Sequence, residues 1–332
     1  MENMKPLLLR LYQHETLSRE EAKAILMKIS AGAFDPIQVA SFVTVFNVRP
    51  ITLEEIQGFR DAMLELCVKV DIGGVETIDI VGTGGDGKNT FNISTLSAVV
   101  VAGAGYKVSK HGSYGVSSSV GSSDVLMAMG YEFTNDTDKL KRQVDEANIC
   151  FLHAPLFHPA MKEVVPTRRA LKVPTFFNML GPLVNPLQPK YQLFGTFSLA
   201  LSRMYQYIMQ ETGRQFSIVY ALDGYDEISL TGQFKLRTNQ SEQLMAARDL
   251  GMATLTQTDL HGGDTAEEAA TIFKNVLANE CTAAQLSVVS ANAGVAIHCI
   301  KPEQSLEDCI AEAKESIVSK KAQTTFQKLV AV

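Results

Sequence analysis

The most constraining feature of this chain is a short apolar run that ends in a cluster of glycines and leads into a helix-like stretch. The apolar run covers residues 78–81, the helix-like stretch covers residues 94–104, and between them stands Gly82-Thr83-Gly84-Gly85-Asp86. This order predicts a strand, a loop and a helix, which is the unit that builds α/β folds with a parallel sheet.

Glycines in such a loop let the backbone take positive φ and bring its N–H groups close to an anion, while the next helix presents its N-terminus. Phosphate binding is one interpretation of the loop, and a tight strand-to-helix turn is the other. The spacing matches neither the G-x-G-x-x-G pattern of dinucleotide-binding folds nor the P-loop, in which Gly-Lys is followed by Ser or Thr.

Further short apolar runs predict more buried strands, and segments with helical spacing separate most of them. The candidate strands are residues 107–109, 149–153, 192–196 and 216–222. The candidate helices include residues 138–147, 199–210 and 306–317. We therefore expect an α/β layer architecture with a predominantly parallel sheet.

The start of the chain instead predicts helices, because capping signals precede apolar residues at helical spacing. These signals are Ser18 with Glu21, Asp35-Pro36, and Thr52 with Glu55. Seven of the eleven prolines lie in residues 155–189, and this composition favours helix and loop over strand.

Composition narrows the class of protein. The 332 residues are 46% hydrophobic, enough for two domains with real cores. The net charge of -6 and the lack of a basic run argue against a nucleic-acid partner. No secretory signal stands at the start, and no stretch approaches the roughly 20 apolar residues of a membrane span, so we expect a cytoplasmic protein. Five cysteines without Cys-x-x-Cys spacing predict buried thiols rather than disulfides or zinc ligands.

Three further polar segments carry candidate chemistry. Asn92, Ser94 and Thr95 stand at a predicted helix start, where they cap the helix or bind phosphate and metal. Lys110-His111 ends a predicted strand and feeds a loop of small hydroxyl residues, a pattern that suits a polyphosphate. Asp226-Glu227 is either a solvated loop or a pair of carboxylates for Mg²⁺.

In this order the segments resemble the anthranilate phosphoribosyltransferase family, and the resemblance runs across nearly the whole chain. The later matching stretches are residues 158–162, Arg168-Arg169, residues 177–186 and Asp226-Glu227. The resemblance implies a small all-helical domain and a larger α/β domain of the nucleoside phosphorylase and phosphoribosyltransferase type, assembled as a homodimer. On this basis we expect the helical domain to comprise residues 1–73 with about 163–190, and the α/β domain residues 74–162 with about 191–332.

The resemblance also implies an activity: Mg²⁺-dependent transfer of phosphoribosyl from phosphoribosyl pyrophosphate to the amine of anthranilate, with release of pyrophosphate, in tryptophan biosynthesis. Residues implied to bind phosphoribosyl pyrophosphate are Gly82, Gly85, Asp86, Thr90, Asn92, Ser94, Thr95, Lys110, Ser117, Ser118 and Ser122. Those implied to bind anthranilate are Gly82, His111, Ser113, Arg168 and Gly181. The implied Mg²⁺ ligands are Ser94, Asp226 and Glu227, and the implied catalytic residues are Lys110, Asp226 and Glu227.

These residue types suit the reaction. Cations and N–H donors stabilise the departing pyrophosphate, and the fork of Arg168 matches a carboxylate. Taken alone, without the surrounding motifs, Arg168 instead favours one half of a surface salt bridge. His111 either orients substrate or packs beside Lys110, and a neutral arylamine needs no strong base. The chain departs from the family at Ser113, where asparagine is common, and at Tyr114, where arginine is frequent.

Two other functions compete with this interpretation. A pyrimidine nucleoside phosphorylase has a similar fold and a related lysine and serine loop, but it would need only inorganic phosphate. A non-catalytic nucleic-acid-binding relative would carry a basic surface. The full set of phosphate-binding motifs with the acidic pair disfavours the first, and the acidic balance with the intact Asp226-Glu227 pair disfavours the second.

Overall fold

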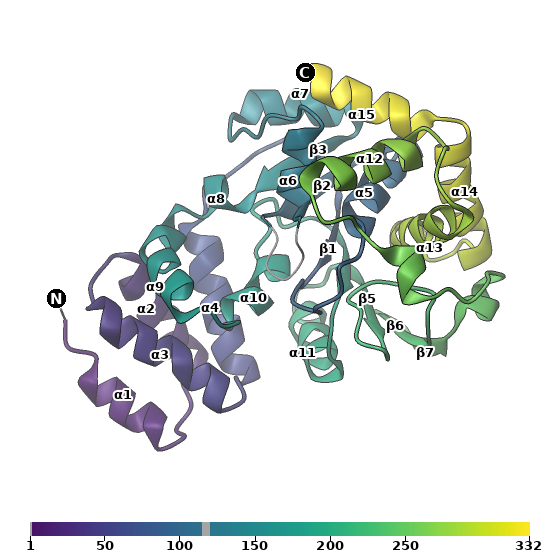
Figure 1. Ribbon diagram of the computed structural model, residues 1–332. Coiled ribbons are helices and arrows are strands. Elements are labelled where there is room, and N and C mark those ends of the chain that lie inside the picture. The colour runs from purple at the N-terminus through teal and green to yellow at the C-terminus, as the bar shows by residue number, and fades with distance from the viewer. Residues whose placement is uncertain (1, 115–119) are drawn as a thin grey trace. The chain divides into compact units, whose positions relative to one another are not determined.

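The computed structural model describes residues 2–114 and 120–332. The chain divides into two compact units, Met1–Lys69 with Ala154–Pro186 and Val70–His153 with Leu187–Val332 (Figure 1). We call them the helical unit and the α/β unit and describe each by itself.

The helical unit begins with four helices, α1 (Lys5–Tyr12), α2 (Arg19–Ser30), α3 (Pro36–Val48) and α4 (Leu53–Leu66). The two expected capping boxes are present: Ser18 and Glu21 cap α2, and Thr52 and Glu55 cap α4. Asp35 caps α3 through the backbone N–H of Ile37. The start signals read from the sequence are therefore confirmed.

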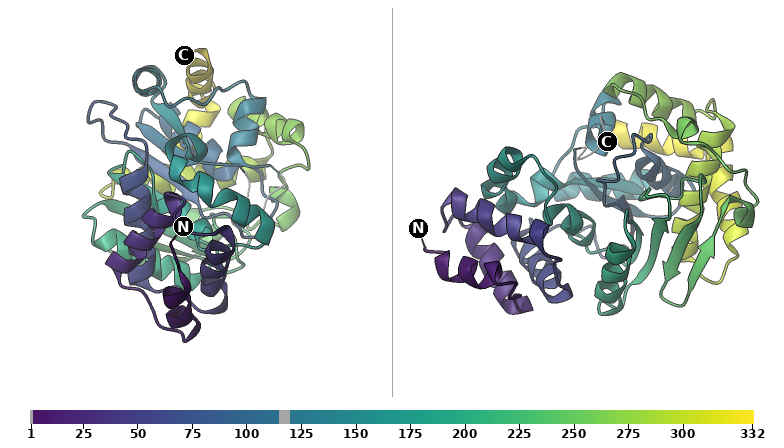
Figure 2. Two further views of the ribbon diagram at one scale, coloured as in Figure 1. Left: turned by 90° about the vertical axis from the view of Figure 1, so that its left-hand side faces the viewer. Right: turned by 60° about the horizontal axis from the view of Figure 1, so that its bottom comes forward.

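The second segment of the helical unit adds α8 (Ala154–Phe157), η1 (Pro159–Glu163), α9 (Val165–Leu171), α10 (Phe177–Leu180) and η2 (Gly181–Leu183). α9 packs on α3, and α10 packs on α4. Figure 2 shows the ribbon from two further sides. Aromatic rings fill the space between them: Phe59 stacks on Phe176 with ring centroids 4.5 Å apart, and Phe42 and Phe46 contact both rings edge-on.

The α/β unit is built on one seven-stranded sheet in the order β3-β2-β1-β4-β5-β6-β7. The strands β1 to β5 are parallel, and β6 and β7 are antiparallel. Their bounds are β1 (Ile78–Gly82), β2 (Val108–Gly112), β3 (Ile149–His153), β4 (Tyr191–Gly195), β5 (Gln215–Ala221), β6 (Phe234–Thr238) and β7 (Glu242–Met245). The predicted fold class, with its predominantly parallel sheet, is confirmed.

Helices connect and cover these strands. They are α5 (Ile93–Gly103), α6 (Ser122–Ala128), α7 (Thr137–Ala147), α11 (Leu199–Gln210), η3 (Ala247–Leu250), η4 (Gln257–Leu260), α12 (Ala266–Leu277), α13 (Ala283–Ile300), α14 (Leu306–Val318) and α15 (Lys321–Ala331). The chain moves from β1 to β2 in one direction across the sheet and from β4 to β5 in the other, so right-handed crossovers place α5 and α11 on opposite faces.

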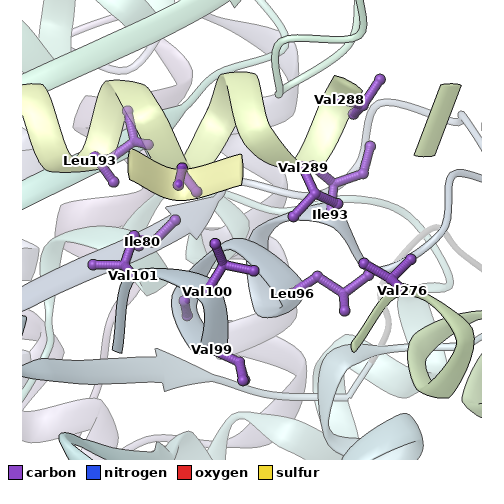
Figure 3. Close-up of a cluster of buried hydrophobic side chains, with 14 of the residues drawn as sticks. Ile80, Ile93, Leu96, Val99, Val100, Val101, Leu193, Val276, Val288 and Val289 are labelled. Atoms are coloured by element: carbon purple, nitrogen blue, oxygen red, sulfur yellow. The ribbon is translucent and has the colours of Figure 1, made fainter. Parts of the chain in front are cut away.

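The core of the α/β unit lies around α5, which is apolar on all sides because sheet and helices surround it. Figure 3 shows Val99, Val100 and Val101 of α5 among side chains from β1, β4, α12 and α13. This burial fixes α5 rigidly. The segment between β1 and α5, residues 83–92, is called the glycine loop below. The first turn of α5, which follows this loop, is therefore held in a defined position.

Several sequence-based expectations need correction. The second helical segment begins at Ala154 rather than near residue 163, because β3 ends at His153 and Phe157 is already buried, with its carbonyl accepting from the N–H of Val68. The strand expected at residues 107–109 extends to Gly112. The strands β6 and β7 and the helices α12, α13 and α15 were not among the predicted elements.

α13 also bears on the membrane question. By length and composition its 18 residues, with mean hydropathy 1.4, reach what a membrane-spanning helix requires. Most of this helix is buried inside the α/β unit, where it packs on α5 and α14. The core helix of a folded domain gives the same pattern.

Candidate functional site

Candidate residues of the α/β unit gather where the parallel strands end. β1 ends at Gly82, β2 at Gly112 and β4 at Gly195, and Asp226-Glu227 follows β5. In open α/β sheets, ligands bind outside the carboxyl ends of the strands, where the strand order reverses. Here that point lies at β1 and β4, from which the chain departs toward opposite edges.

Asp226 ties the glycine loop to the segment after β5. One of its carboxylate oxygens, Oδ2, accepts a hydrogen bond from the backbone N–H of Gly84 at 2.7 Å. A Cβ on Gly82 would stand 2.4 Å from the same oxygen, and a Cβ on Gly195 would stand 1.5 Å from the backbone oxygen of Asp226. Both strands must therefore end in glycine for Asp226 to reach its place.

Glu227 and Lys110 meet the first turn of α5. The Oε1 atom of Glu227 accepts from the backbone N–H of Ser94 at 3.2 Å, and Nζ of Lys110 lies 3.5 Å from the Oγ of Ser94. Nζ of Lys110 also donates to the carbonyl of Ile80. A small cavity of about 20 Å³, room for roughly one water molecule, is lined by Gly82, Ser94, Gly195, Asp226 and Glu227 among others.

The acidic groups here are poorly compensated. Burial and the nearby Asp86 raise the pKa of Asp226 to about 7. Burial, Asp226 and Asp86 raise the pKa of Glu227 well above its usual range, and its Oε2 has no hydrogen-bond partner among the described residues. Burial lowers the pKa of Lys110, although the nearby Asp79, Glu227 and Asp226 act to raise it. When they are ionised, the carboxylates of Asp86, Asp226 and Glu227 outnumber the single ammonium of Lys110, so a bound cation would stabilise their ionised forms.

The glycine loop itself has an open backbone. Gly84, Gly85 and Gly87 have φ of +62°, +80° and +70°, which only glycine adopts freely. Asp86 between them accepts from the N–H of Lys88 at 3.0 Å, and burial raises the pKa of Asp86. A glycine-rich backbone of this kind is common in anion-binding loops.

The residues at the start of α5 divide into two kinds. Asn92 occupies the N-cap position but makes no side-chain capping hydrogen bond, so its amide remains available to a ligand. Thr95 is only 1% exposed, and its Oγ1 has no hydrogen-bond partner among the described residues. Thr95 is thus more deeply buried than Ser94, and its hydroxyl stays a candidate contact.

The segment after β2 contains the remaining candidates of this unit. His111 is buried, and its backbone N–H donates to Asp79 at 3.1 Å. Ser113 is exposed, and its carbonyl accepts from the Oγ of Ser122 at 3.0 Å. Tyr114 contacts the ring of His153 edge-on. The implied ligands Ser117 and Ser118 lie outside the described residues.

Arg168 and Gly181 belong to the helical unit. Arg168, on α9, stacks over the ring of Phe177 at 5.4 Å, and its Nη2 donates to the Oδ1 of Asn178 at 3.4 Å. Burial lowers its pKa. Among the described residues it has no carboxylate partner, so the alternative of a surface salt bridge loses its support. Gly181 follows α10 and has open space beside its Cα.

The donor set of the α/β unit fits Mg²⁺. No three His, Cys, Asp or Glu side chains form a complete metal site in the part of the chain that the structure describes. Mg²⁺ does not need such a cage, because it commonly takes one or two carboxylates and completes its shell with phosphate oxygens and water. The unpartnered Oε2 of Glu227 is the oxygen that such an ion would satisfy.

Comparisons with known proteins agree with this geometry. Residues 74–323 match the model of a glycosyl transferase family a/b domain, and residues 5–67 match the helical bundle domain of that family. The chain is 54% identical to an anthranilate phosphoribosyltransferase of Cytophaga hutchinsonii and 53% identical to one of Christiangramia forsetii. Each match covers 98% of this chain and at least 98% of the relative. The chain belongs to the anthranilate phosphoribosyltransferase family.

Solved structures of the family share the fold. The enzyme of Thermus thermophilus has a TM-score of 0.90 at 30% identity, and 98% of each chain is covered. The enzyme of Saccharomyces cerevisiae, in complex with phosphoribosyl pyrophosphate and Mg, has a TM-score of 0.90 at 26% identity, covering 98% of this chain and 96% of the other. The family expected from the sequence motifs is therefore confirmed.

Three residues of this family member were missed by sequence reasoning. Gly195 is required by the approach of Asp226, and Asp79 anchors the backbone of His111. Asn292, on α13, accepts from the N–H of Ile228 at 3.0 Å and donates to its carbonyl at 2.9 Å. It thereby fixes the backbone directly after the acidic pair. A buried asparagine within an apolar helix was the one available signal.

Proposed function

We propose that this protein transfers the phosphoribosyl group of phosphoribosyl pyrophosphate to the amine of anthranilate, giving N-(5-phosphoribosyl)anthranilate and pyrophosphate, a step of tryptophan biosynthesis. The observation that carries the proposal is the meeting of Gly84 with Asp226, and of Ser94 with Glu227 and Lys110, at one edge of the sheet. These groups come from four separate segments of the chain. Relatives over 50% identical along the full length support the same activity.

The diphosphate of the donor would lie against the glycine loop and the start of α5. Gly85, Asn92, Ser94 and Ser122 offer N–H, amide and hydroxyl donors there, and the positive end of the helix favours an anion. Thr90 is a further proposed contact. The hydroxyl of Thr95 is another proposed contact.

Asp226, Glu227 and Ser94 would hold Mg²⁺, which, when bound, neutralises the phosphate oxygens of the leaving pyrophosphate. The chain's own part is to keep these oxygens fixed before substrate arrives. Gly84 holds Asp226, and the backbone of Ser94 holds Glu227. Preorganised charges of this kind cost no reorganisation as the bond to the leaving group breaks.

Lys110 would stabilise the negative charge that develops on the leaving group. Its ammonium is oriented by the carbonyl of Ile80 and the hydroxyl of Ser94. No general base is required, because the arylamine nitrogen is neutral near pH 7 and attacks directly. These residues thus bind and orient the substrates and neutralise the leaving group, and this positioning supplies most of the rate enhancement.

Arg168 would bind the carboxylate of anthranilate. Its guanidinium lacks an internal carboxylate partner among the described residues and is held by Phe177 and Asn178. A bidentate pair with a carboxylate would satisfy it. Gly82, His111, Ser113 and Gly181 are proposed neighbours of the acceptor, with His111 acting mainly through its buried backbone contact.

We further propose a homodimer in the cytoplasm. Four large apolar side chains on α1 and α3 are strongly exposed, namely Leu9, Tyr12, Ile37 and Val48. Exposed apolar residues on neighbouring helices are a common basis for self-association. Light scattering coupled to gel filtration tests this assembly by the mass in solution.

The decisive experiment follows the fluorescence of anthranilate in the presence and absence of phosphoribosyl pyrophosphate and of Mg²⁺. Consumption is expected only when both are present and should stop when EDTA removes the metal. A parallel reaction supplies uridine and inorganic phosphate. Turnover there without any anthranilate consumption would overturn the proposed function in favour of a nucleoside phosphorylase.

A further inference from the structure

The segment of residues 260–264 lies against the second half of the glycine loop, far away in the sequence. The carbonyl of Leu260 accepts from the N–H of Phe91 at 2.9 Å. The N–H of Gly262 donates to the carbonyl of Asn89, also at 2.9 Å. These bonds flank an isolated antiparallel bridge between Thr90 and His261. The loop is thus paired with the segment as a very short ribbon.

Side chains reinforce the pairing. The Nδ2 of Asn89 donates to the carbonyl of Gly263 at 3.1 Å and lies 3.5 Å from Oδ1 of Asp264. The side chain of Asn89 therefore spans the ribbon beside its backbone bonds.

Gly262 sets how close the two segments come. A Cβ there would stand 2.5 Å from the carbonyl oxygen of Thr90 and 2.8 Å from the N–H nitrogen of Phe91. These are backbone atoms, which cannot turn aside as the end of a long side chain can. Any larger residue at position 262 must therefore move the loop.

The first half of the loop is held at its start, where the N–H of Thr83 donates to the carbonyl of Gly195 at 3.0 Å. A Cβ on Gly84 or Gly87 would meet nothing within 4 Å. The loop is held by Asp226 through the N–H of Gly84 and, beyond Asp86, by residues 260–264. A loop anchored at both ends loses less entropy when a ligand orders it.

The same stretch continues into α12, whose N-cap is Thr265. α12 packs against α6, and α6 begins at Ser122. One continuous piece of chain, residues 260–277, therefore supports two of the segments that the proposed function assigns to phosphate binding.

We infer that residues 260–264 form a positioning clamp that fixes the glycine loop for phosphoribosyl pyrophosphate, with Gly262 and Asn89 as its determining residues. The inference rests on the proposed function and adds residues that the sequence motifs do not contain. The clamp residues need not touch the substrate. They act through the position of Thr90 and of the start of α5.

The first test compares Gly262→Ala with Gly103→Ala. In Gly103→Ala the new Cβ would stand 2.5 Å from the Oγ of Ser316 and 2.6 Å from the Cα of Ala322, a similar clash in the same unit but at the opposite end of α5. We expect Gly262→Ala to raise the KM and Kd for phosphoribosyl pyrophosphate with Mg²⁺ on the order of tenfold or more. Its KM for anthranilate should change little, and Gly103→Ala should lower only the melting temperature.

The second test does not depend on steric tolerance. Asn89→Ala removes the bond to Gly263. Asn239→Ala, beside the ends of β5 and β6, removes a similar bond to the carbonyl of Arg214, 2.8 Å long, and also the acceptor for the N–H of Phe216. Only Asn89→Ala should raise the KM for the donor. An unchanged donor KM and Kd in Asn89→Ala, or equal changes in both asparagine variants, would overturn the clamp while leaving the proposed function intact.

Isothermal titration with phosphoribosyl pyrophosphate and Mg²⁺ separates the two ideas. If the wild-type chain neither binds the donor nor consumes anthranilate, the proposed function fails, and the clamp fails with it. If the wild-type chain binds and turns over, the variant results decide the clamp alone.

Discussion

Two buried glutamates should respond in opposite ways to the same substitution, Glu to Gln. Glu55, in the helical unit, is 0% exposed and forms an ion pair with Arg49. It also accepts from the backbone N–H groups of Leu17 and Thr52, each at 2.9 Å. Glu227, in the α/β unit, accepts one bond from Ser94, and its other oxygen has no partner among the described residues. Both oxygens of Glu55 therefore have hydrogen-bond donors, whereas only one oxygen of Glu227 has a donor among the described residues.

The magnitudes follow from these contacts. Burial alone would raise the pKa of Glu55, but the bonds from Arg49, Thr52 and Leu17 outweigh it and lower the pKa. Glu55→Gln leaves Arg49 buried without its counter-charge, which should reduce the free energy of unfolding by about 3–5 kcal/mol. Burial raises the pKa of Glu227, so ionising this carboxyl in the fold costs free energy. Glu227→Gln removes that cost and keeps the acceptor for Ser94, so it should stabilise the fold by up to about 1–2 kcal/mol.

The two substitutions should affect activity in the reverse order, with the larger loss in Glu227→Gln. Glu227→Gln removes a charge that would hold Mg²⁺ and should lower kcat by about 10²- to 10³-fold. Glu55→Gln should keep its kcat at temperatures where it is folded. The assays are urea denaturation for stability and anthranilate fluorescence for turnover. If Glu227→Gln destabilised the protein as much as Glu55→Gln, or retained full activity, Glu227 would be a structural carboxylate and not a metal ligand.

Three further substitutions test other parts of the proposal. Ser113→Asn restores the amide common in the family and should preserve activity while lowering the KM for anthranilate; an equal or higher KM contradicts this role. Arg168→Lys loses the planar fork and should raise the same KM by about tenfold with the donor KM unchanged, as initial-rate kinetics would reveal. Burial lowers the pKa of His158 from its ordinary 6.5 to about 4, so protonation favours the unfolded chain. The unfolding free energy should fall by about 3 kcal/mol as pH drops from 6.5 to 4, and His158→Gln should flatten that part of its pH profile.

Local signals in the sequence predicted the local parts of the fold. The capping boxes at Ser18 and Thr52 act within four residues, so the helices that they start follow from neighbours in the chain. The buried parallel strands are short apolar runs between helices, and they too were recognisable. The antiparallel strands β6 and β7 escaped prediction because β6 mixes buried and half-buried residues, and β7, at the edge of the sheet, is almost fully exposed.

The candidate site was predictable only as a set of motifs. Each motif allowed an ordinary structural interpretation: the glycine loop, Ser94, Lys110 and the acidic pair. Only their order along the chain made the family resemblance specific. The distinction between Ser94 and Thr95 was not accessible in this way. Both hydroxyls sit at one helix start, and only the packing of α5 decides that Ser94 contacts Lys110 while Thr95 enters the core.

The glycines that sequence reasoning missed share one physical cause. Gly195 and Gly262 are constrained by atoms of distant segments, the backbone oxygen of Asp226 and that of Thr90. The bonds that accompany these approaches join residues 142 and 174 positions apart. No local propensity encodes such a requirement, since nothing beside either glycine in the chain demands the lack of a side chain. Close approach at the ends of β1 and β4 therefore places the acidic pair. Close approach at residue 262 places the loop that faces it.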